Sequence, residues 1–194
     1  MLQLLINEVQ MATDSIEMRH RKKYLLLGGV PEKPNEDVPH VILSILNKNL
    51  GFKDVTSSSL LSAHRLGLES KDHIRPILFR FTDVALRGQV WKKKTSLKGT
   101  PYVMSEFLTK LRQSLFLETR KHFGMRSVWT SDGSVYVKLN NGSRARIQSK
   151  KELEHLVADQ IKDPPAPSNT GSEQETSAQT PAKTAHIRPK RLRR

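Results

Sequence analysis

The fold of the C-terminal half is decided by the stretch VWTSDGSVYVKLNNGSRARI, residues 128–147. It predicts three short strands joined by two tight turns. The Asp-Gly pair is the signal for a two-residue type I′ hairpin, and Asn-Asn-Gly fits a three-residue loop with Gly142 in the left-handed conformation. The first turn therefore pairs Trp129 with Tyr136, and the second turn pairs Tyr136 with Arg146.

These registers divide the side chains of the small sheet between two faces. The apolar face carries Val135, Val137, Leu139, Ala145 and Ile147. The other face carries two aromatic and three cationic residues, namely Trp129, Tyr136, Lys138, Arg144 and Arg146. Flat rings beside cations suit single-stranded nucleic acid, because bases stack on the rings while the cations hold phosphates. The alternative is that both rings pack beneath a helix and the cations are only solvated.

The whole chain is strongly basic. Its 194 residues include 33 Lys and Arg against 19 Asp and Glu, a formal net charge of +14. That surplus favours nucleic acid as the partner, with acidic membranes or proteins second. The absence of cysteine excludes disulfides and cysteine-ligated metal sites.

No apolar run approaches the roughly 18 residues of a membrane span, and the N-terminus lacks the pattern of a signal peptide. We therefore expect an intracellular protein of the cytoplasm or nucleus, not secreted and without a membrane partner.

Residues 23–104 predict the order strand-helix-strand-strand-helix-strand, the split βαβ arrangement of a ferredoxin-like domain. The strands come from KKYLLLGGV, SSLLSAHRLG, RPILFRF and TPYVMSE. We expect Asn35 to cap the first helix, Gly51 to end it, and Thr82 to cap the second helix.

Residues 105–162 predict a second α+β unit. It begins with the helix FLTKLRQSLFLETRKHFG, continues with the three strands, and closes with the helix SKKELEHLVADQI. We expect the first of these helices to face inward with Leu108, Leu111 and Leu115. Residues 163–194 are too polar to form a core, so we expect a disordered tail. Its basic end, with Arg188, Lys190, Arg191, Arg193 and Arg194, suits nonspecific electrostatic binding or nuclear import.

Residues 1–22 predict a helix with apolar residues at alternating steps of three and four, the seam of a short coiled coil. The seam consists of Leu2, Leu5, Val9, Ala12 and Ile16. It predicts self-association as a dimer or trimer. The alternative is an amphipathic helix that packs on its own domain.

Two parts of the chain resemble known families. The pattern GGVPE…LSAHRLG…RPILFRF resembles the RNA-recognition-motif-like (RRM-like) domain in first-open-reading-frame proteins of LINE-type retrotransposons. Residues 105–157 resemble the C-terminal domain of the baculovirus few-polyhedra (FP) protein and its insect relatives. The resemblance implies single-stranded nucleic-acid binding and coiled-coil oligomerisation without catalysis. It also implies that Arg65 and Arg75 bind the nucleic-acid backbone and that Arg112 faces a cleft between two domains.

The usual RNA-recognition-motif signature is incomplete in this sequence. It needs aromatics on the two central strands with glycines between them. Tyr24, Phe79 and Phe81 are present, but the glycines are missing. The two phenylalanines alternate with Leu78 and Arg80, which is also the pattern of core residues. Base stacking on the first sheet is therefore weaker as a prediction than phosphate binding by arginines.

The remaining signals favour binding over catalysis. Lys92, Lys93 and Lys94 form a basic run that could grip phosphates or simply be a solvated face. There is no His-Glu-x-x-His, Gly-Lys-Ser/Thr loop or Gly-x-Ser-x-Gly elbow. We expect no enzymatic activity, cofactor or metal, although scattered acidic residues leave a nuclease as an open alternative.

The expected function is binding of single-stranded nucleic acid, RNA rather than DNA, with low sequence specificity. The alternative is a scaffold for protein partners in which the charge is incidental.

Overall fold

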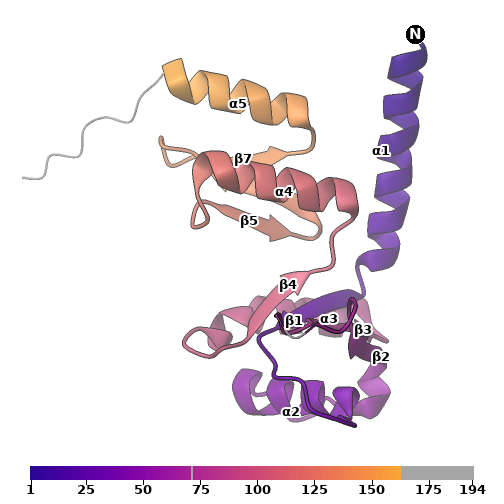
Figure 1. Ribbon diagram of the computed structural model, residues 1–194. Coiled ribbons are helices and arrows are strands. Elements are labelled where there is room, and N and C mark those ends of the chain that lie inside the picture. Colours follow the sequence, from indigo (N-terminus) through magenta and orange to yellow (C-terminus); the bar gives the residue numbers. More distant parts are fainter. Residues whose placement is uncertain (71, 163–194) are drawn as a thin grey trace, which may run out of the picture. The chain divides into compact units, whose positions relative to one another are not determined.

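The computed structural model describes residues 1–70 and 72–162, and the predicted tail lies outside them (Figure 1). These residues form a mixed α+β structure with an N-terminal helix and two antiparallel sheets, as the sequence predicts. The helices are α1 Leu2–Arg21, α2 Val38–Leu50, α3 Val84–Lys92, α4 Lys110–Phe123 and α5 Lys150–Lys162. The strands are β1 Tyr24–Gly28, β2 Leu60–Arg65, β3 Ile77–Phe81, β4 Val103–Glu106, β5 Val128–Ser131, β6 Ser134–Lys138 and β7 Arg144–Ile147. Short 3₁₀ turns η1 Ser57–Ser59 and η2 Lys93–Leu97 complete the described elements.

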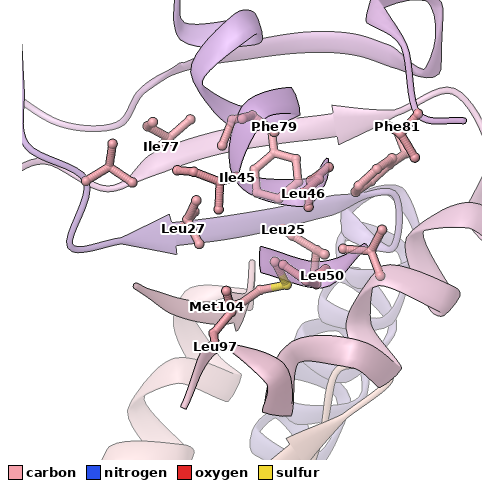
Figure 2. Close-up of a cluster of buried hydrophobic side chains, with 14 residues drawn as sticks. Leu25, Leu27, Ile45, Leu46, Leu50, Ile77, Phe79, Phe81, Leu97 and Met104 are labelled. Carbon is pink, nitrogen blue, oxygen red and sulfur yellow. The ribbon is translucent and has the colours of Figure 1, made fainter. Parts of the chain in front are cut away.

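The first sheet contains four strands in the order β2-β3-β1-β4, and every neighbouring pair is antiparallel. Its buried face packs on α2 and α3 to form one hydrophobic core, shown in Figure 2. Phe79 and Phe81 lie fully buried in that core, edge to face with ring centroids 5.3 Å apart. Of the two roles open from the sequence, these phenylalanines therefore serve the core. They offer no surface for base stacking.

The caps of α2 and α3 differ from the prediction. Asp37, not Asn35, caps α2 by accepting a hydrogen bond from the backbone N–H of His40. Proline in the first turn of α2 has a fixed φ that suits a helix start, which places the cap at the residue before Val38. Asp83, not Thr82, caps α3 by accepting from the Leu86 N–H, while the Thr82 hydroxyl bonds to the Ser59 carbonyl. The predicted end of α2 at Gly51 is confirmed, with a left-handed φ of 71°. In each helix, the carboxylate next to the first turn took the capping role.

The second sheet, β5-β6-β7, has the predicted registers. Trp129 pairs with Tyr136, and Tyr136 pairs with Arg146. Asp132 and Gly133 both have positive φ, 52° and 76°, as a type I′ turn requires. The predicted apolar face packs against α4 and α5 in a second core that contains Val135, Val137, Ile147, Leu115 and Leu153.

The helix predicted over residues 107–124 begins only at Lys110, so Leu108 precedes it, and one of its three expected inward leucines is exposed. Leu108 and Leu115 are buried, but Leu111 is 48% exposed. The first turn of α4 lies beside α1, where Arg112 donates to Asp14. There Leu111 lines a small cavity of about 90 Å³ together with Met11 and Leu115.

The predicted N-terminal helix is confirmed, and its apolar seam is exposed. Leu2, Leu5, Val9 and Ile16 are 57–73% exposed. The seam therefore does not pack on the domain. The helix instead buries Asp14 and Met18, which lie on another face. The Met18 side chain occupies the space where a side chain at Gly133 would lie.

Candidate nucleic-acid interface

The candidate interface starts on the side of the second sheet that faces away from α4 and α5. We call this side the aromatic face, and it carries Trp129, Tyr136, Lys138, Arg144 and Arg146. The two rings are parallel within 13°, with centroids 5.9 Å apart, and both are partly buried. The Arg144 guanidinium lies 5.8 Å from the centre of the Trp129 ring. All three cations are exposed. Neither ring belongs to the core beneath α4 and α5.

Two clefts border this face and bring predicted residues together. The first, of about 440 Å³, is lined by Trp129 and also by Trp91, Lys94 and Arg120. It places one lysine of the basic run beside the aromatic face. Burial lowers the pKa of Lys94, whose ammonium lies 3.3 Å from the centre of the Trp91 ring. The other two lysines of the run are exposed, although Lys93 also bonds to the Leu50 carbonyl.

The second cleft, of about 360 Å³, lies between α1 and the aromatic face, and we call it the α1 cleft. It contains three predicted binding residues, Arg112, Tyr136 and Arg146. The Arg112 side chain donates from Nε to Asp14 at 2.7 Å and from Nη1 to the Gly133 carbonyl at 2.8 Å. Asp14 also accepts a hydrogen bond from the Thr109 hydroxyl. This cluster holds α1, the start of α4 and the Asp-Gly turn together.

Arg65 and Arg75 lie away from both clefts and are already engaged. All five N–H donors of the Arg65 guanidinium are used, by the two carboxylate oxygens of Glu36 and by three backbone carbonyls. Its side chain is only 6% exposed. Arg65 therefore has no N–H left for a phosphate, and it fixes the chain between β1 and α2 instead.

Arg75 pairs with Glu32 but keeps some donor capacity. Its Nη2 lies 2.6 Å from a Glu32 oxygen, and its backbone N–H donates to the same carboxylate. These hydrogen bonds lower the pKa of Glu32 to about 2 and raise the pKa of Arg75. The Nη1 group of Arg75 makes no hydrogen bond to a described residue, so a phosphate contact there stays a prediction.

Sequence reasoning missed two cations of the α1 cleft, Arg19 and Lys22. Both lie at the C-terminal end of α1, where basic residues are common because they complement the helix dipole. Helix periodicity alone could have shown that Ser15, Arg19 and Lys22 share one side of the helix with the buried Met18. It could not have shown that this side meets the second sheet, because that contact depends on tertiary structure.

Comparison with family models and with curated proteins finds no match to this chain. No helix among the described residues is long and apolar enough to cross a membrane. In the same part of the chain, no group of three or more His, Asp or Glu side chains is placed to hold a metal ion.

Proposed function

We propose that this chain is a non-enzymatic protein that binds single-stranded nucleic acid, RNA in preference to DNA, with low sequence specificity. The observation that carries the proposal is the stacked pair Trp129 and Tyr136 with Arg144 over the indole ring and two further exposed cations beside it. Aromatic faces accept any base, and cations hold the backbone without reading sequence. The net charge of +14 supports the same partner.

Two further elements of the proposal concern architecture. The element order and the strand order β2-β3-β1-β4 of the first sheet support an RRM-like arrangement. This first domain would contribute mainly cationic side chains to binding, because Phe79 and Phe81 lie in its core. The exposed seam of α1 supports self-association as a coiled-coil dimer or trimer. Several copies on one strand would then bind more tightly than one copy, in the cytoplasm or nucleus.

The test is Trp129→Ala in a chain that also carries Trp91→Phe, so that Trp129 is the only tryptophan in the parent. A single strand should quench the emission of the parent, and Trp129→Ala should weaken binding by roughly 1–3 kcal/mol. The melting temperature should change little, because the ring lies outside both hydrophobic cores.

Two other outcomes would contradict the proposal. If Trp129→Ala greatly lowers the melting temperature and the parent shows no quenching, the ring is a structural residue and stacking is wrong. If the parent does not bind a single strand even at low salt, the scaffold alternative replaces nucleic-acid binding altogether.

A further inference from the structure

The α1 cleft has the composition of an anion site. Four of its side chains are cationic and come from three different elements: Arg19 and Lys22 from α1 and its C-cap, Arg112 from α4, and Arg146 from β7. Asp132 is the one carboxylate among the residues that line it. Like charges that line one cleft repel one another, and an anion bound between them relieves that repulsion. The cleft therefore favours a negatively charged ligand.

The cations of the cleft are available to such a ligand. Arg19 and Arg146 make no ion pair and no side-chain hydrogen bond with any described residue. Lys22 pairs with Asp132 at 3.0 Å, but this pair is solvent-exposed, 41% and 69%, and exposed pairs contribute little free energy. Arg112 uses Nε and Nη1 for its internal bonds, so its Nη2 is available.

Hydroxyl groups complete the site. Ser131, Ser134 and Tyr136 line the same cleft, and none of their hydroxyls has a hydrogen-bond partner among the described residues. Guanidinium, ammonium and hydroxyl donors together are the groups that contact backbone phosphates in protein–nucleic-acid complexes. Tyr136 also stacks on Trp129, so the cleft is continuous with the aromatic face.

We propose that the α1 cleft binds a backbone phosphate of the single strand whose bases contact the aromatic face. Arg19 and Lys22 then belong to the nucleic-acid interface, and α1 has a binding role besides self-association. This inference rests on the proposed function. It adds a specific phosphate site and assigns two residues of α1 to it.

The experiment compares two double variants of the full chain that remove equal charge. Arg19→Ala/Lys22→Ala empties the cleft of two cations. Lys48→Ala/Lys53→Ala removes two exposed lysines of α2 and the loop after it, outside the cleft. Binding to a fluorescent single-stranded oligonucleotide is measured over a range of salt concentrations, beside a melting curve and a light-scattering mass for each variant.

The cleft variant should bind about tenfold more weakly. Its salt slope should fall by about 0.7, because the cleft holds one phosphate and each neutralised phosphate on a single strand contributes about 0.7. The control should change affinity and slope much less. Asp132→Asn tests the same site in the opposite direction, since asparagine also tolerates the positive φ of this turn. Removing the negative charge should strengthen binding about threefold.

Equal effects in the two double variants would overturn the phosphate site, because only net charge would then matter. Unchanged binding in the cleft variant, while Trp129→Ala still weakens it, would also overturn the site and leave the proposed function standing. A parent chain that binds no single strand would instead remove the proposed function itself. If the cleft variant does not fold, Asp132→Asn decides: binding that is unchanged or weaker contradicts the site.

Discussion

Glu106 should be one of the residues on which stability depends most strongly. It ends β4, and its side chain is completely buried. One carboxylate oxygen accepts from Arg87 of α3 at 2.7 Å, and the other accepts from the Gly133 N–H at 3.2 Å. A single carboxylate thus connects α3, β4 and the turn between β5 and β6.

The expected magnitude follows from burial. Glu106→Gln keeps the size of the side chain but leaves the Arg87 charge without its counter-ion in a position where the arginine side chain is 7% exposed. Removing one partner of a buried ion pair costs roughly 3–5 kcal/mol. For a chain of this size, that corresponds to a fall in melting temperature on the order of 10 °C. Arg87 cannot turn its charge outward without losing contact with the Trp91 ring, 5.3 Å away.

The assay is denaturant unfolding of four chains: the parent, Glu106→Gln, Arg87→Met and the double variant. The double variant should recover much of the stability that Glu106→Gln loses, because Arg87→Met removes the buried charge that would otherwise lack its counter-ion. Glu118→Gln is the matched control, since Glu118 pairs with Lys150 in a partly exposed ion pair and should change stability little. The reasoning is refuted if Glu106→Gln costs less than about 1 kcal/mol or if the double variant is as unstable as the single one.

Two further predictions concern acid stability and assembly. The pKa of Glu32 is lowered to about 2 by its hydrogen bonds to Arg75, so the stability from this pair is complete above the ordinary value of 4.5 and is lost as the pH falls towards 2. Glu32→Gln should therefore flatten the acid dependence of the unfolding free energy in that range, and an unchanged pH profile would contradict the role of this pair. Leu5→Ser/Val9→Ser should lower the mass measured by light scattering at high protein concentration, because it removes two exposed seam residues. Gln3→Ser/Gln10→Ser on the same helix is the control, and equal masses for parent and seam variant would argue against the coiled coil.

The second sheet was predictable in detail because its contacts are local. Each strand pairs with the next one along the chain, and the conformational preferences of Asp-Gly and Asn-Asn-Gly set the register. Once the register was known, the alternation of side chains decided which residues are in the core and which form the aromatic face. The same reasoning identified the exposed cations of that face.

Residues whose partners are distant in sequence were not predictable in this way. Arg65 has the pattern of a free arginine on an edge strand, yet Glu36 and the backbone carbonyls of Val30, Pro31 and Arg75 occupy all its donors. Leu111 has helical spacing to Leu115, but α1 lies beside that turn of α4. Propensity and periodicity describe one element at a time, so they cannot show which other element covers it.

The buried Asp14 changes how the role of α1 has to be tested. In sequence, it is a polar position of a short coiled coil, and deletion of residues 1–22 would be a natural test of oligomerisation. In the structure, Asp14 accepts from Arg112 and Thr109, and Met18 packs on the Gly133 turn. Deletion would leave the Arg112 charge without its counter-ion and expose the apolar surface beneath Met18.

A truncated chain that lost both assembly and binding would therefore not separate the two roles of α1. Substitutions on different faces of the helix can separate them, because the seam residues are exposed and Arg19 and Lys22 line the α1 cleft. If the seam variant lowers the mass but keeps the binding of one copy, and the cleft variant keeps the mass but weakens binding, each role belongs to its own face. If either variant changes both the mass and the binding, the two faces of α1 depend on each other. The Asp14–Arg112 ion pair would then connect them, because it links α1 to α4 beside the cleft.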